Sequence, residues 1–207
     1  MISSLTDGAK FIFSSKVVRG LIIGMIGAFI AAGAVIGLAR TYVGDLNAGD
    51  AAYGILFGSV FTGLAGGIAL GPKIFSQFSR RRLFGAALTT AGIFLIVLSL
   101  LQNLVIAILT VLIIGLFSGV CWVSGFTMLG MEVADDVRGR TFAFVQSLIR
   151  IVLVLVLAVA PVIAASIGEH EYTIRHVTLT YNGAAFTMFF ASIIAIAVGV
   201  FSYHQMK

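Results

Sequence analysis

Charged residues are scarce in this sequence of 207 residues. Aspartate, glutamate, lysine and arginine make up 10% of the chain and apolar residues 60%. In soluble domains about a quarter of all residues are charged. So few charges do not cover a water-facing globule of this size, which argues against a soluble enzyme or a nucleic-acid-binding domain. The apolar share argues against a disordered segment. The class that fits this composition is a polytopic helical membrane protein.

The side chains that build catalytic and metal sites are also few. The single cysteine, Cys121, excludes an internal disulfide and is expected to be a small core residue. His170, His176 and His204 have no partner at metal-ligand spacing. The sequence contains no G-x-x-x-x-G-K-[ST] segment to cradle a phosphate. We therefore expect no catalytic site, no metal and no cofactor in this chain.

Six stretches are long and apolar enough to cross a bilayer, which takes about 20 residues. The uncharged run from Leu83 to Met131 would be roughly 70 Å long as one helix, more than twice the hydrocarbon thickness. We divide it at Gln102-Asn103. The predicted spans are 20–39, 51–72, 83–101, 104–128, 141–167 and 182–203, after a linker 1–19 and before a tail 204–207. The predicted fold is thus an all-α bundle of six transmembrane helices.

Basic residues gather on one side of this predicted bundle. With the termini and the loops 73–82 and 132–140 on one face, the opposite face keeps only Arg40 and Arg175. The basic residues of the first face are Lys10, Lys16, Arg19, Lys73, Arg80, Arg81, Arg82, Arg138, Arg140 and Lys207. The positive-inside rule then predicts cytoplasmic termini in a multi-pass protein of the cytoplasmic membrane. The net charge of +5 is a topology signal, and the expected partner is the lipid bilayer, not nucleic acid.

Glycine recurs at four-residue spacing in the predicted spans. Such small-xxx-small faces allow close approach of membrane helices. The pairs are Gly20 and Gly24, Gly33 and Gly37, Gly54 and Gly58, Gly63 with Gly67 and Gly71, and Gly115 and Gly119. Tight static packing and sliding of helices against their neighbours both explain this pattern.

Polar residues form a stripe on the fifth predicted helix. Gln146, Ser147 and Arg150 follow the helical period, with Ala143 on the same side. Arg150 lies near mid-membrane, keeps its charge and has no acidic residue within any span. As a structural residue it bonds to backbone carbonyls of a neighbouring helix or snorkels inward, and as a functional residue it lines a water-accessible path.

The fourth predicted helix carries Ser118, Trp122, Gly125 and Leu129 on one face, which ends at Glu132. Trp122 lies deeper than the usual interfacial belt. It forms either an aromatic wall of a cavity or part of the ordinary core. At the other end of the bundle, the loop 168–181 has rough apolar alternation that suggests an extended segment, and Asn182 is expected to cap the sixth helix.

Charges of both signs meet at the predicted cytoplasmic face. They can pair within one loop or between loops, as a latch on helices that move, or they can simply hold topology. The residues are Glu132, Asp135, Asp136, Arg138 and Arg140 in one loop and Arg80, Arg81 and Arg82 in the other.

Two cytoplasmic segments, GPKIFSQFSRRRLFG and EVADDVRGRTFAF, resemble loops of the major facilitator superfamily of secondary transporters. Within this superfamily, the chain most resembles the second half of the membrane region of proteins in which such a region is fused to a thymidylate kinase. The stretches that carry this resemblance are GLARTYVGDL, SRRRLFG, RGRTFAFVQSLIR, LAVAP and YNGAA. The resemblance implies that an N-terminal six-helix half precedes this chain and that a kinase domain follows it. Between Gly71 and Arg80 the sequence lacks the acidic residue that the family places before its basic cluster.

Two functions remain open at this point. The chain is either the C-terminal half of a transporter, forming one wall of an alternating-access path for a small molecule, or a non-transporting membrane anchor for a fused kinase. The stripe with Arg150 favours the first function. The missing acid and the kinase resemblance favour the second.

Overall fold

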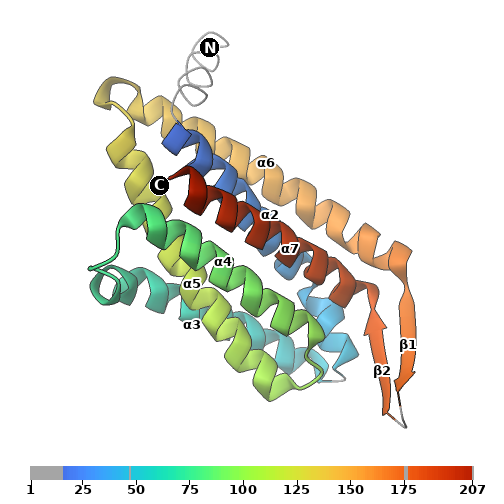
Figure 1. The fold of residues 1–207 in the computed structure, drawn as a ribbon. Coiled ribbons are helices and arrows are strands. Elements are labelled where there is room, and N and C mark those ends of the chain that lie inside the picture. The colour runs from blue at the N-terminus through green and yellow to red at the C-terminus, as the bar shows by residue number, and fades with distance from the viewer. Residues whose placement is uncertain (1–15, 47, 175–176, 207) are drawn as a thin grey trace.

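A computed structural model describes residues 16–46, 48–174 and 177–206 of the chain (Figure 1). Its helices are α2 (Lys16–Asp45), α3 (Gly49–Ile74), α4 (Arg80–Leu100), α5 (Leu104–Glu132), α6 (Asp135–Ile167) and α7 (Gly183–Gln205). All six are long and apolar enough to span a membrane. The predicted bundle of six helices that can span a membrane is confirmed.

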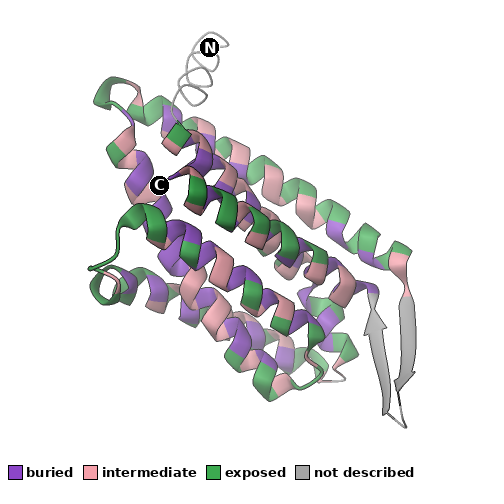
Figure 2. Ribbon diagram, in the orientation of Figure 1, coloured by how far each residue is buried: buried purple, intermediate pink, exposed green. Residues whose placement is uncertain are grey.

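The helices form two groups that share a central seam. α2 packs on α6 and α7, whereas α5 packs on α3 and α4, and the contact between α4 and α7 joins the groups. This leaves α3 and α6 at the flanks, where each has one principal neighbour. Most of the length of α6 is exposed or half-buried (Figure 2). The described ends of the chain lie at one end of the bundle, which we call the termini end (Figure 1).

A β-hairpin extends from the opposite end of the bundle (Figure 1). Its strands, β1 (Glu169–Ile174) and β2 (Val177–Asn182), pair antiparallel, with Glu169 opposite Asn182 and Ile174 opposite Val177. The loop that the sequence predicted as extended is therefore a ladder of backbone hydrogen bonds. The all-α prediction holds for the bundle but did not include these strands.

One predicted helix end is wrong. α6 begins at Asp135 rather than at residue 141, so most of the predicted loop 132–140 is helical. Asp135 and Asp136 lie in the first turn of α6, where the helix dipole stabilises negative charge. At the other end of the bundle Asn182 ends β2 and directly precedes α7, at the position where the sequence predicted a cap. Asn103 is a true cap, since its side chain accepts hydrogen bonds from the amides of Val105 and Ile106.

The predicted glycine faces have two different roles. Gly63 and Gly67 of α3 lie against backbone of α5, and Gly115 and Gly119 of α5 lie against backbone of α3. A methyl group at any of these four positions would fall inside van der Waals contact with a backbone carbonyl of the other helix. These glycines therefore allow the close approach of α3 and α5. In contrast, Gly54, Gly58 and Gly66 face open space on α3.

Candidate functional site

The exposed surface of α6 is divided into a polar and an aliphatic side. The buried residues Val145, Ile149, Ala160 and Ala164 form one edge of the helix, which packs against the bundle. Successive residues turn by about 100° around a helix, so the exposed residues fall into two neighbouring strips. The polar strip holds the exposed Ala143, Ser147 and Arg150 and the half-buried Gln146, and it continues toward the hairpin with the exposed Val154. The aliphatic strip holds Ile151, Leu155, Val159 and Val162. The predicted stripe thus lies on the surface of this six-helix unit.

Arg150 is exposed at the middle of α6. Its guanidinium makes no hydrogen bond or ion pair with any residue in the described part of the chain. Ser147, one turn before it, donates its hydroxyl hydrogen to the carbonyl of Ala143 at 2.8 Å. The structural alternative from the sequence, a bond from Arg150 to backbone carbonyls of a neighbouring helix, is not found among the described residues.

Aromatic rings form a continuous row across three helices. Trp122 of α5 contacts Phe29 of α2, with ring centroids 5.7 Å apart, and Phe126 of α5, with centroids 4.9 Å apart. Phe126 in turn contacts Phe142 of α6, with centroids 6.1 Å apart. The sequence analysis missed these three phenylalanines because a phenylalanine in an apolar span is equally compatible with core, lipid or cavity.

The register between α2 and α6 places Arg150 level with Phe29, at one end of this aromatic row. Both helices run from the termini end toward the hairpin (Figure 1). Gly33 of α2 lies against Leu153 and Val156 of α6, and Gly37 of α2 lies one turn further on, against Leu157. Following the same register back by one turn puts Arg150 beside the turn of α2 that holds Phe29. A fixed positive charge therefore lies at the depth of Phe29, whose ring contacts Trp122.

The face predicted on α5 is only partly a single surface. Trp122 is 42% exposed and Ser118 is half-buried. Gly125 and Leu129, which the sequence placed with them, are buried in the core. Gly125 is closely covered by Met25 and Phe84. The α5 face is therefore open only around Ser118 and Trp122, on the hairpin side of Gly125.

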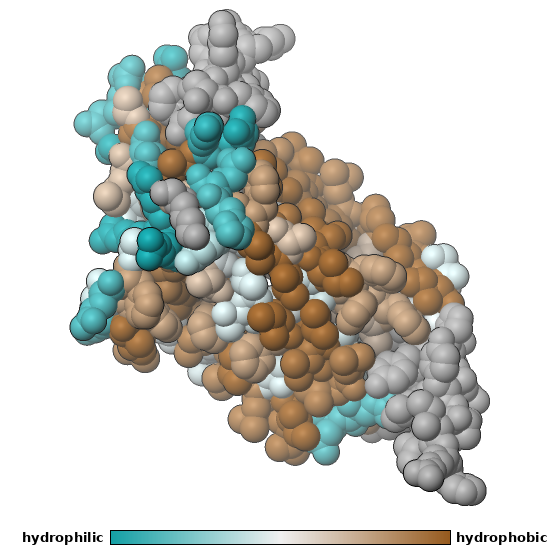
Figure 3. Space-filling model, viewed as in Figure 1, coloured by the Kyte–Doolittle hydropathy of each residue, from teal (hydrophilic) through white to brown (hydrophobic). Residues whose placement is uncertain are grey.

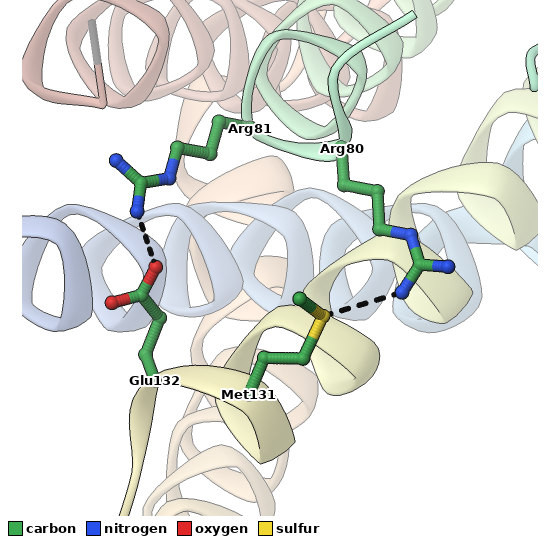
Figure 4. Close-up of polar contacts among 4 residues, drawn as sticks. All are labelled: Arg80, Arg81, Met131 and Glu132. Carbon is green, nitrogen blue, oxygen red and sulfur yellow. Dashed lines mark hydrogen bonds and ion pairs between the residues drawn. The ribbon is translucent and has the colours of Figure 1, made fainter. Parts of the chain in front are cut away.

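Hydrophilic residues gather at the termini end, a smaller hydrophilic patch lies near the hairpin, and a wide apolar surface lies between them in the view of Figure 3. At this end Arg81 of α4 and Glu132 of α5 form an ion pair at 2.6 Å (Figure 4). Arg138 instead pairs with Asp135 of its own helix at 2.5 Å and donates to the carbonyl of Val133.

Only one ion pair at the termini end joins two helices in the described part of the chain, the pair of Arg81 with Glu132. The acid that the 73–82 loop lacks is thus supplied by α5. Arg138 orders the short link between α5 and α6 and does not reach across the face. Arg82, Asp136 and Arg140 are exposed and form no ion pair within the described ranges.

Within the described residues no group of histidine, cysteine, aspartate and glutamate could hold a metal ion. The family model described as transmembrane secretion effector, a model of the major facilitator superfamily, matches residues 1–206. Comparison with curated proteins gives no match.

Proposed function

The chain belongs to the transmembrane secretion effector family of the major facilitator superfamily, and we propose that it forms the C-terminal six-helix half of a secondary transporter. In this proposal an N-terminal half of the same protein packs against the exposed sides of α3, α5 and α6. A small molecule moves between the two halves, whose cytoplasmic sides carry the termini. The polar strip of α6 and the row around Trp122 form one wall of the path.

The observation that carries this proposal is the unpaired charge of Arg150 on an exposed helix surface. An arginine at the centre of a membrane helix costs about 2.5–3.5 kcal/mol on insertion scales. Lipid does not offset this cost, whereas water in a path or the groups of a second half do. The aliphatic strip beside it, with Leu155, is suited to lipid. The two strips of α6 therefore favour an arrangement in which one side faces the path and the other faces the bilayer.

Cysteine accessibility tests this arrangement directly. In the full-length protein in liposomes, we expect Arg150→Cys to react with a charged, membrane-impermeant thiol reagent, because only a water-filled path exposes the thiol at that depth. Leu155→Cys is the matched control. Leu155 is 57% exposed in this six-helix unit and lies about 8 Å further along the axis, on the aliphatic strip. It is expected to remain unreacted.

Equal reactivity at both positions, or none at Arg150→Cys in any state of the protein, would contradict the proposed path. Absence of reaction would instead support the alternative function, a membrane anchor for a fused enzyme, whose mid-membrane arginine needs only a static partner. The assay needs no knowledge of the transported molecule.

The proposed orientation makes a separate prediction. Cysteines introduced at Gln77 and Asp136, both at the termini end, should be protected from an impermeant thiol reagent in intact cells. A cysteine at Glu171, in the hairpin, should react, because the hairpin lies at the other end of the bundle (Figure 1). Permeabilised cells, in which all three positions should be labelled, provide the control. Labelling of Gln77→Cys from outside would reverse the topology.

The pair of Arg81 with Glu132 is proposed as a latch on the cytoplasmic side. Exposed pairs of this kind contribute about 0–1 kcal/mol each, so we expect Glu132→Arg to leave the folded protein intact. Loss of the pair should shift the conformational equilibrium toward the state open to the cytoplasm by up to about fivefold. The readout is faster labelling of path cysteines from the cytoplasmic side. The double exchange Arg81→Glu with Glu132→Arg should restore the original rate.

Arg138→Ala serves as the control for the latch, because it removes a positive charge from the same face without breaking a contact between α4 and α5. An equal shift in Arg138→Ala, or no recovery in the double exchange, would assign these charges to membrane topology alone.

A further inference from the structure

A cavity of about 260 Å³ lies at the termini end, between the end of α3, the start of α4 and the middle of α5. Its wall includes the rings of Phe75 and Phe78, the hydroxyls of Ser124 and Thr127, and Arg80. On α5, Ser124 and Thr127 point to the opposite side from Trp122, given about 100° per residue. The cavity is therefore separate from the proposed transport path.

Two hydroxyls at the cavity have no hydrogen-bond partner in the described structure. Most helical serines and threonines of this chain donate to the carbonyl three or four residues earlier, as Ser59 and Thr62 do. Ser124 is only 6% exposed and borders the cavity, and neither it nor Thr127 makes such a bond within the described residues. Neither hydroxyl oxygen is sealed in the core, so both are free to donate hydrogen bonds to oxygen atoms of a ligand in the cavity.

The mouth of the cavity is positively charged and lacks an acid. The guanidinium of Arg80 lies against the sulfur of Met131 at 3.3 Å, a weak acceptor, whereas its neighbour Arg81 holds Glu132 (Figure 4). Arg80 is also the first residue of α4, and the side chain of the preceding Ser79 does not cap the helix. The first amides of a helix are without intrahelical partners and attract anions.

We infer that this cavity binds the phosphate and glycerol oxygens of an anionic phospholipid. Arg80 and the amides at the start of α4 meet the phosphate, and Ser124 and Thr127 meet oxygens deeper in the bilayer. Ser124 lies roughly 12 Å along α5 from its end at Glu132, a separation that fits a headgroup with the start of its chains. Basic pockets between membrane helices on the cytoplasmic side are suited to anionic lipid headgroups.

The binding test uses the full-length protein in nanodiscs, with Ser76→Cys as a reporter because Ser76 is exposed and borders the cavity. Cys121 is buried and adds little background. We expect phosphatidylglycerol to slow maleimide labelling of Ser76→Cys about tenfold relative to phosphatidylcholine alone, from the energy of charge-assisted hydrogen bonds. Arg80→Gln should abolish this protection, and Ser124→Ala should weaken it.

Arg82→Gln is the matched control, since it removes the same charge from the same helix end at a residue outside the cavity wall. It should leave the protection intact. Equal losses in Arg80→Gln and Arg82→Gln, or equal labelling in both lipids, would overturn the inference. Protection by inorganic phosphate in phosphatidylcholine nanodiscs would also overturn it, by assigning the site to a soluble anion. None of these results depends on whether the protein transports.

Discussion

Gly67→Ala is expected to destabilise the protein by about 3 kcal/mol, at the upper end of the cost of overpacking. The added methyl group would overlap the backbone carbonyl of Leu116 on α5. Because backbone, unlike a side-chain tip, cannot rotate away, α3 and α5 must separate. The contact between these helices is the most extensive of the described bundle, so the separation loses packing along the whole crossing. The measurement is the Tm and the monodisperse yield of the purified full-length protein.

Gly66→Ala is the matched control for this prediction. It makes the same chemical change at the adjacent residue of the same helix, where the structure leaves open space. Alanine has a higher helix propensity than glycine, so the expected effect is neutral or stabilising by up to about 1 kcal/mol. Similar losses from both substitutions would show that the flexibility of α3, and not the close approach to α5, requires these glycines.

Arg150→Lys and Arg150→Met are both expected to abolish transport by the full-length protein while expression and Tm stay near those of the unaltered protein. Lysine keeps the charge but loses the planar fork of donors that binds a carboxylate or phosphate with two hydrogen bonds. Methionine removes both and lowers the cost of membrane insertion. Since the guanidinium has no bond to lose within the described residues, substitution should leave the packing of α6 unchanged.

The measurement is efflux or uptake by cells or liposomes that contain the full-length protein, with Ile151→Met as the control. Ile151 is adjacent to Arg150 and exposed, but it lies on the aliphatic strip. A loss of folded protein in both Arg150 variants would make Arg150 a structural tie to the other half. Full activity of a stabilised Arg150→Met would remove α6 from the transport path.

The number of membrane helices could be predicted from the sequence, because the length of an apolar run and the thickness of a bilayer are both local quantities. Arg150 could also be recognised from the sequence as an unusual residue, because a single charge in a long aliphatic run is costly wherever the helix is placed in the bundle. Helix ends were less predictable. Asp135 and Asp136 were assigned to a loop because they are polar, whereas at the start of a helix acidic residues are stabilising.

Residue spacing alone did not distinguish the two sets of glycines. Gly66 and Gly67 are adjacent in the sequence, yet one faces open space and the other faces the backbone of α5. Their difference depends on which side of α3 meets a neighbour, and that is decided by packing between segments far apart in the chain. The same limit applies to Trp122, whose contacts with Phe29 and Phe126 come from helices that the sequence could not pair.

The sequence by itself determined that this chain is a six-helix membrane unit, that its basic residues gather at one end, and that Arg150 is a charge inside a long apolar stretch with no acid in any predicted span. Each follows from composition along the chain and the properties of the bilayer. Only the tertiary structure decided that Glu132 pairs with Arg81, that Arg80 borders a cavity, and that Arg150 lies level with Phe29. Each of these needs a rotation and a register between helices, which arise from side-chain packing and not from the hydropathy of any single helix.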